Sequence, residues 1–390
     1  MADRELGAGA WSYFGDPRAI SHDGDTFTGW ISTTGNVWVA RFTAAGTLRK
    51  KLIYRGLGRD DHNNPALAFR PDGHLVVFFS PHSGRHLPRG QTSQLRYRIS
   101  LKPHAIDEWG PVHLVDTNVP GGLGYTYPNA IPQRGKLWLF WRGGGWNPTF
   151  SYTRNYRDWA PARELVRFGH GQRPYAKYAG DGRSRIHGIF TNGHPTSWKN
   201  SLFYMRYENG ALHAADGRRL GSLRSVPLEV TELDAIYRYS DRSGRAWAHD
   251  LALDPDSGNP RVVYTRRVAN RDTFYYAYFN GTRWASRRIV EAGAGRNSFH
   301  SGGASFDHED PRIIYLSRTI GRWNQVEAWV TLDHGRTWQT RQLTTADDGY
   351  AIRPVAPRGL RGRQQVLYVH GDERTRGYSD FTTRIRALDF

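Results

Sequence analysis

The stretch NPALAFRPDGHLVVFFSPH, residues 64–82, has the pattern of an antiparallel hairpin: a short strand that begins with small residues, a polar turn and an apolar strand. Six other stretches repeat this unit: DPRAISHDGDTFTGWIS (16–32), YPNAIPQRGKLWLFWR (127–142), RPYAKYAGDGRSRIHGIFTNGH (173–194), AHDLALDPDSGNPRVVYTR (248–266), HSGGASFDHEDPRIIYLSR (300–318) and AIRPVAPRGLRGRQQVLYVH (351–370). Seven units average about 55 residues each, the size of one four-stranded propeller blade. The sequence therefore predicts an all-β protein, a seven-bladed β-propeller that forms a single domain over residues 1–390.

A second signal for this fold is TLDHGRTW, residues 331–338, which matches the Asp-box pattern (S/T)-x-D-x-G-x-(S/T)-W. The motif resembles the hairpin turn typical of sialidase-like propellers, where its role is structural. Helical signals are weak, because 43 glycines and 20 prolines are spread through the chain. Short alternating apolar runs between turn residues indicate strands instead.

The composition narrows the classes of partner. Lys+Arg total 54 against 36 Asp+Glu, which gives a formal net charge of +18, and only six of the basic residues are lysines. Arginine offers a planar fork for carboxylate, sulfate or phosphate, so the excess implies an acidic polysaccharide or a nucleic acid. A GC-rich genome would explain the preference for arginine over lysine, but it would not explain the excess of basic over acidic residues. The chain has no cysteine, which excludes disulfides and thiolate metal sites.

The hairpins are expected to bring polar side chains to one face. In an antiparallel hairpin the start of the first strand and the end of the second lie at the same end. If these are the two inner strands of each blade, those ends meet near the axis. Strand starts carry Arg18, His62, Tyr127, Arg173, Tyr175, His249 and His300, and strand ends carry His82, Arg142, His194, Arg266, Arg318 and His370. This concentration of His, Arg and Tyr predicts a binding or active site.

Seven motifs also carry a family resemblance: GAWSYFGDPRAI, DDHNNPAL, YTYPNAI, LFWRGG, RPYAKY, IHGIFTNGHP and YENGALHAADG. They resemble, in this order, the BNR-repeat propeller family of polysaccharide lyases, which includes the short ulvan lyases and the L-rhamnose-α-1,4-D-glucuronate lyases. The second half of the chain matches only as generic blades. The resemblance implies β-elimination at an α-L-rhamnosyl-(1→4)-glucuronate bond, in ulvan or in rhamnose-capped arabinogalactan such as gum arabic.

This reaction needs a base for the C5 proton of the uronate, an acid for the leaving C4 oxygen and a group that neutralises the carboxylate. By resemblance, His62 corresponds to a catalytic histidine, His82 to a second active-site histidine, Tyr127 to a tyrosine that acts as acid or base, and Arg142 to the neutralising arginine. Which of the first three is base and which is acid stays open. The candidate substrate contacts are Asn63, Arg173, Tyr175, Lys177, Asn192, His194, His249 and His300.

The two histidines also have a structural interpretation. His62 can simply cap a turn, with Asp60 and Asp61 holding its ring. Its pairing with His82 across one predicted hairpin favours a functional role. By contrast, His187 lies within the apolar stretch RIHGIF and is expected to be buried.

The tyrosine and the arginine have structural alternatives as well. Tyr127 precedes Pro128, which predicts an extended backbone. Its ring can pack in a blade core, which would leave Tyr125 as the functional tyrosine. Arg142 can stack on an adjacent tryptophan without a catalytic role.

Two other functions remain open: a sialidase-like glycoside hydrolase and a non-catalytic lectin for acidic glycans. A hydrolase usually needs two carboxylic acids, whereas the predicted face is poor in carboxylates. A pure binder has little use for paired histidines beside a tyrosine and an arginine. The favoured partner is therefore an acidic polysaccharide, with no nucleic acid and no membrane, and the protein is expected to be a monomer.

The chemistry requires no cofactor, although structural ions are conceivable. HDGDTF (22–27) and DPDSGN (254–259) have the character of Ca²⁺ loops but also of ordinary Asp-Gly turns. His249, His300 and His370, from three different blades, are candidate Zn²⁺ ligands. No signal peptide is visible in MADRELGAGAWSYFG (1–15), yet a polymer substrate favours a secreted, extracellular enzyme.

Overall fold

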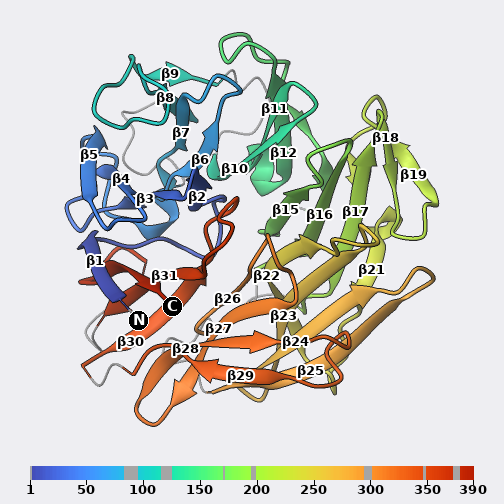
Figure 1. Ribbon diagram of the computed structural model, residues 1–390. Coiled ribbons are helices and arrows are strands. Elements are labelled where there is room, and N and C mark those ends of the chain that lie inside the picture. Colours follow the sequence, from blue (N-terminus) through green and yellow to red (C-terminus); the bar gives the residue numbers. More distant parts are fainter. Residues whose placement is uncertain are drawn as a thin grey trace.

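The computed structural model describes residues 2–82, 95–115, 125–169, 172–194, 199–293, 301–345, 348–371 and 378–390. Seven sheets surround a central axis as the blades of a propeller (Figure 1), which confirms the predicted all-β, seven-bladed fold. Helical structure in these ranges consists of three short 3₁₀ helices, η1 (Asp61–Asn63), η3 (Gly144–Trp146) and η4 (Val230–Glu232). No helix in the described ranges has the length and apolar character needed to cross a membrane.

The strands follow one another outward from the axis in each blade. Blade 1 contains β2 (Ala19–His22), β3 (Asp25–Ile31), β4 (Val37–Phe42) and β5 (Leu48–Tyr54). Blade 2 contains β6 (Ala66–Phe69), β7 (Leu75–Phe79), β8 (Arg96–Ile99) and β9 (His113–Leu114). Blade 3 contains β10 (Thr126–Gln133), β11 (Lys136–Arg142), β12 (Pro148–Thr153) and β13 (Arg163–Glu164).

Blade 4 is larger, with β15 (Ala176–Gly180), β16 (Arg185–Thr191), β17 (Leu202–Glu208), β18 (Ala211–His213), β19 (Arg219–Ser222) and β21 (Asp234–Tyr237). Blade 5 contains β22 (Arg245–Leu253), β23 (Pro260–Val268), β24 (Arg271–Phe279) and β25 (Trp284–Gly293). Blade 6 contains β26 (Ala304–Phe306), β27 (Ile313–Ile320), β28 (Trp323–Val330) and β29 (Gln339–Gln342). A short parallel pair joins β14 (Val166–Arg167), which follows blade 3 in the sequence, to β20 (Leu228–Glu229), which lies between β19 and β21 of blade 4.

Blade 7 joins the two ends of the chain. Its inner strands are β30 (Tyr350–Val355), β31 (Gln365–Gly371) and β32 (Arg384–Asp389), and β1 (Ala2–Ala8) adds the outer strand. Strand β1 pairs antiparallel with β32, and Figure 1 shows both termini at this blade. The ring is therefore closed by hydrogen bonds between its first and last strands.

The apolar run of β7 explains how the blades pack. Successive side chains of a strand point to opposite faces. Leu75 and Val77 pack in the cluster between blades 1 and 2, whereas Val76 and Phe78 pack in the cluster between blades 2 and 3. Each face of an inner strand is thus buried against a neighbouring blade, which is why the run is continuously apolar.

The predicted Asp-box turn connects β28 and β29. The backbone N–H of Gly335 donates to the hydroxyl of Thr331 at 2.7 Å, and the N–H of Thr337 donates to the carboxylate of Asp333 at 2.9 Å. Trp338 then packs against Trp329, with ring centroids 6.1 Å apart. The motif therefore has the structural role expected from the sequence.

Residues 9–18 run across the axis between the inner strands. The N–H of Ser12 donates to Asn64 of blade 2 at 3.0 Å, and the N–H of Asp16 donates to the carbonyl of Pro128 of blade 3 at 3.0 Å. The segment contributes two rings to a buried aromatic cluster at the axis, which comprises Tyr13, Phe14, Tyr127, Tyr175 and Trp247. We call this group the axial aromatic cluster.

Two buried ion pairs of Asp16 hold this segment in place, and they lead to a prediction for stability. Oδ2 of Asp16 lies 2.6 Å from the ammonium of Lys177, and its Oδ1 lies 3.0 Å from Nε of Arg18. Burial would raise the pKa of Asp16, but Arg18 and Lys177 lower it from 3.8 to about 2. Asp16→Asn is expected to cost about 3–5 kcal/mol in the free energy of unfolding, measured with urea, because it leaves Lys177 charged and buried.

The lowered pKa of Asp16 makes the free energy of unfolding fall at acidic pH. Because the folded pKa of Asp16 is depressed, its contribution of about 2 kcal/mol is present above about pH 4 and is lost as the pH falls toward 2. The matched control is Asp107→Asn, in an exposed pair with Arg49 at 3.4 Å, where the loss should stay below about 1 kcal/mol. Equal losses in the two variants would contradict the role of the buried pair.

Candidate active site

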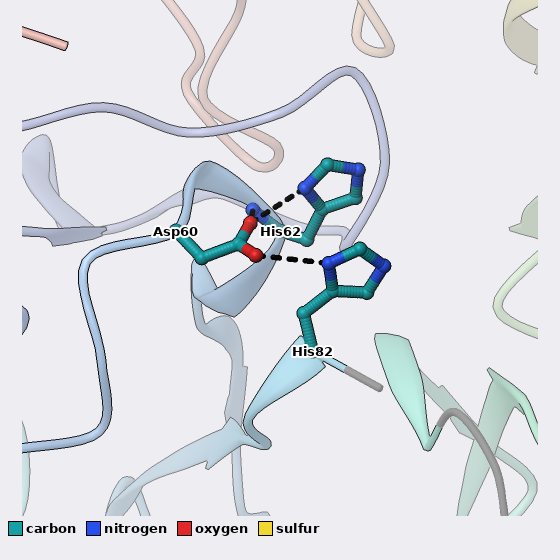
Figure 2. Close-up of side chains that lie close together, drawn as sticks. All are labelled: Asp60, His62 and His82. Atoms are coloured by element: carbon teal, nitrogen blue, oxygen red, sulfur yellow. Dashed lines mark hydrogen bonds and ion pairs between the residues drawn. The ribbon is translucent and has the colours of Figure 1, made fainter. Parts of the chain in front are cut away.

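His62 and His82 meet at one end of blade 2. His62 lies in η1, immediately before β6, and His82 follows β7, so the hairpin brings the two side chains together as predicted. Asp60 caps η1 by accepting the N–H of His62 at 2.9 Å. The same carboxylate bridges the two rings, with Oδ1 2.6 Å from Nδ1 of His62 and Oδ2 2.9 Å from Nδ1 of His82 (Figure 2).

The two imidazoles are stacked, with centroids 4.0 Å apart and planes 4° from parallel. A carboxylate accepts hydrogen bonds, so Nδ1 of each ring carries a proton. The second nitrogen of each ring, Nε2, lies on the side that faces away from Asp60 (Figure 2). The arrangement therefore presents two Nε2 atoms side by side in one direction.

The carboxylates divide the charge unequally between the rings. Oδ1 of Asp61 also lies 2.9 Å from Nδ1 of His62. Burial alone would lower the pKa of His62, but Asp60 and Asp61 raise it to about 10. Burial, together with the positive charge on His62, lowers the pKa of His82 to about 4. At neutral pH His62 is a cation, and His82 is neutral with a free lone pair on Nε2.

Neighbouring groups hold this pair in place. Oδ1 of Asn63 accepts the backbone N–H of His82 at 2.6 Å. Arg353 reaches in from blade 7, where its Nη1 lies 2.6 Å from Oδ2 of Asp61. Burial would raise the pKa of Asp61, but Arg353 and His62 hold it below its usual value. Asn63 is 1% exposed, so it positions His82 rather than contacting a ligand.

Tyr127 stands beside His62 on a distorted strand. Its φ is +60°, and the pairing of β10 with β11 shifts register between Thr126 and Asn129, which forms a bulge. The extended backbone predicted from Pro128 is therefore wrong. Bulges re-aim side chains, and here the ring of Tyr127 lies 5.4 Å from that of His62. Burial raises the pKa of Tyr127 well above 10, so its hydroxyl stays protonated.

Tyr125 does not share this position. It is 2% exposed and packs against Trp141 in the cluster between blades 2 and 3. Of the two candidate tyrosines, Tyr127 is the one that contacts the histidine pair.

Arg142, at the end of β11, is enclosed by aromatic rings. Its Cζ lies 4.8 Å from the ring centroid of Tyr127, 4.7 Å from that of Trp146 and 5.0 Å from that of Tyr175. Its Nη2 donates to the hydroxyl of Thr126 at 3.3 Å, while Nε and Nη1 have no hydrogen-bond partner among the described residues. Arg142 is 5% exposed, and a buried guanidinium without a counter-charge favours binding of an anion.

Other predicted contacts surround this arginine. Arg173 is exposed, and its Cζ lies 5.1 Å from the ring centroid of Trp146, the ring that also contacts Arg142. The ring of Tyr175 lies 5.8 Å from that of His194. Oδ1 of Asn192 instead accepts the backbone N–H of Ser201 at 2.8 Å, so this side chain shapes its own loop.

Two predicted substrate contacts are not brought to the histidine pair. Lys177 is 1% exposed and is bound within the axial segment. His249 is 2% exposed, with Nε2 3.3 Å from the hydroxyl of Thr265 and 3.1 Å from that of Ser301. Their burial gives both side chains a structural role. His300 lies outside the described residues.

Two residues of this site were missed in the sequence. Arg353 is 292 positions from Asp61, its ion-pair partner. Tyr378 presents its ring perpendicular to those of His62 and His82, at 5.0 and 5.7 Å. Both come from blade 7, where the motifs shared with the lyases are absent, so no local signal marks them.

The candidate metal ligands also find protein partners. Within the described ranges, Asp60, His62 and His82 form the one group whose ligand atoms lie within 4.8 Å of one another, and they already bond to each other. In the two Asp-Gly segments, Asp25 pairs with Arg41 at 2.6 Å and Asp254 pairs with Arg261. An arginine therefore holds a carboxylate in each of these segments.

The fold and the Asp-box turn define a propeller of BNR-type repeats. The model of the BNR repeat-containing family matches residues 25–292. The chain therefore belongs to the BNR repeat-containing family. No protein of curated function matches its sequence.

Solved structures give a similar result for the fold. A polysaccharide lyase of family PL25, an ulvan lyase, has 15% identity and a TM-score of 0.74, covering 98% of this chain and 94% of its own. The same lyase bound to GlcA(1-4)Rha3S units gives a TM-score of 0.73, with equal identity and coverage. An intramolecular trans-sialidase from Ruminococcus gnavus has 10% identity and a TM-score of 0.49, covering 99% of this chain and 96% of its own.

Proposed function

We propose that this protein is a polysaccharide lyase that cleaves an α-L-rhamnosyl-(1→4)-glucuronate bond by β-elimination, in ulvan or in rhamnose-capped arabinogalactan. The observation that carries the proposal is the buried guanidinium of Arg142, which has no ion-pair partner among the described residues, beside a cationic and a neutral histidine. The likeness in fold to an ulvan lyase and the motif resemblance support it. The reaction needs no cofactor, and the proposal includes secretion.

The stereochemistry of glucuronate fits the stacked histidines. In this sugar the C5 hydrogen and the C4 oxygen lie on the same face of the ring. A base and an acid must therefore approach from the same side, a few ångströms apart. Two parallel imidazoles 4.0 Å apart, both turned by Asp60, present their Nε2 atoms in that way.

Each group then has one role in the elimination. Neutral His82 takes the C5 proton on Nε2, and the electron pair of that C–H bond forms the C4=C5 double bond. The C4–O bond breaks, and the leaving oxygen receives the Nε2 proton of cationic His62. Arg142 neutralises the uronate carboxylate as negative charge develops on it, and the protonated Tyr127 donates a hydrogen bond to the same group.

The test is formation of the unsaturated uronate, followed by its ultraviolet absorbance, with ulvan and gum arabic in separate reactions. The wild type is expected to raise the absorbance with one of these polymers. His62→Ala should reduce the rate by at least about 10²-fold, because the leaving oxygen loses its acid.

The matched control is His213→Ala, since His213 lies in β18 and its Nδ1 lies 3.1 Å from the carbonyl oxygen of Gly217. Its rate should equal that of the wild type. Release of new reducing ends without ultraviolet absorbance would favour the glycoside hydrolase instead and would overturn the proposal.

A further inference from the structure

Tyr378 is an exposed ring next to the two histidines. It is 42% exposed and is the only aromatic residue among the large exposed hydrophobic side chains of the described ranges. Its ring stands at 90° to that of His62 and at 86° to that of His82. An exposed aromatic side chain that borders a polar site is typical of a ligand contact.

The backbone of Tyr378 and of the residues that follow it is held by neighbouring groups. The N–H of Asp61 donates to the carbonyl of Tyr378 at 2.7 Å. Arg59 donates to the carbonyl of Phe381 at 2.6 Å and pairs with Asp380 at 3.5 Å. Phe381 is itself 2% exposed. Because residues 378–381 are already held in place, ordering this backbone costs little binding free energy when a ligand stacks on Tyr378.

The charges divide the site into two halves. The rings of Tyr127 and Tyr378 both lie against His62 but not against each other. On the side of Tyr127, Arg142 and Arg173 have no ion-pair partner among the described residues. Between the two rings, Asp60 pairs with His62 and His82, and Asp61 pairs with Arg353. On the side of Tyr378, Asp380 pairs with Arg59. The first half suits an acidic sugar and the second half suits a neutral one.

We propose that Tyr378 is the stacking platform for an unsulfated sugar linked to O4 of the uronate, an inference that rests on the proposed function and fits rhamnose-capped arabinogalactan better than the 3-sulfated rhamnose of ulvan. The C–H face of a 6-deoxyhexose, with its methyl group, provides apolar surface for such a ring. Arg142 holds the uronate carboxylate at the same time, so the two halves fix the direction in which the polysaccharide lies across His62 and His82.

Steady-state kinetics separate this role from a catalytic one. Tyr378→Ala is expected to raise KM about tenfold, because about 50 Å² of apolar surface is no longer buried, and to leave kcat within about twofold. Tyr378→Phe keeps the ring, so its KM should stay close to that of the wild type. The control is Tyr278→Ala in β24, whose ring stacks on His334 in the outer part of the propeller.

Binding without turnover gives a second readout. In a His82→Ala background, which lacks the proposed base, calorimetry compares an oligosaccharide that carries rhamnosyl-glucuronate with a glucuronate oligomer that lacks rhamnose. Adding Tyr378→Ala should weaken the first about tenfold and leave the second unchanged. Equal effects on the two ligands, or none, would overturn the platform.

These outcomes also distinguish the two proposals. If the wild type forms no unsaturated product but rhamnose-dependent binding still requires Tyr378, the lyase proposal fails and the platform stands. If product forms and Tyr378→Ala leaves KM unchanged, the platform fails and the lyase proposal stands.

Discussion

Arg142→Met is expected to lower kcat/KM for the uronate polymer by about 10³-fold, because it removes the buried cation that neutralises the charge developing on the carboxylate. The substitution replaces a guanidinium enclosed by Tyr127, Trp146 and Tyr175 with an apolar chain of similar length. Removal of a buried, unpaired charge should leave thermal stability equal or higher. Loss of activity without loss of stability is therefore the signature, measured by kinetics and thermal unfolding.

Arg142→Lys is the informative companion variant. It keeps the charge but not the planar fork, so it should recover part of the activity and remain well below the wild type. If Arg142→Met instead destabilised the protein and kept its activity, the arginine would act in packing alone.

His82→Ala is expected to lower kcat by about 10³–10⁴-fold, because the C5 proton loses its acceptor. In the wild type, kcat/KM should rise as the pH passes about 4, where His82 loses its proton, and fall as it passes about 10, where His62 loses its own. These limbs belong to the coupled pair. The measurement is the pH–rate profile of the ultraviolet assay.

Asp60→Asn tests the origin of both limbs. The amide keeps the shape of the bridge but removes the charge that raises the pKa of His62, so the alkaline limb should move to lower pH. A profile that Asp60→Asn leaves unchanged would contradict the division of charge between the two histidines.

The sequence predicted the fold because the repeat is local. Each hairpin carries its own turn residues and its own apolar strand, so LVVFF in β7 indicates a doubly buried strand before any contact is known. The same local signal brought His62 and His82 together, since both flank one hairpin. The bridging role of Asp60 follows from its place in DDHNNP, where holding the ring of His62 was one of the two interpretations.

Long-range contacts could not be obtained in this way. Arg353 and Tyr378 reach the site only because the propeller closes and brings these residues of blade 7 into contact with Asp61, which precedes blade 2. The bulge at Tyr127 reversed a local rule, because pairing with β11 and burial against the axial aromatic cluster outweigh the preference that Pro128 imposes. For Lys177 and His249 the position along a strand was predicted, but not the depth at which their side chains are buried.

Closure of the ring by β1 and β32 has a consequence for biosynthesis. His62, His82, Tyr127 and Arg142 are all translated within the first half of the chain, together with the segment that crosses the axis. Their supports from blade 7, Arg353 and Tyr378, are translated more than 200 residues later, before the strand that pairs with β1. A nascent chain on the ribosome therefore carries every proposed reacting group while its active site is still incomplete, and the site is assembled only after the residues of blade 7 have been synthesised.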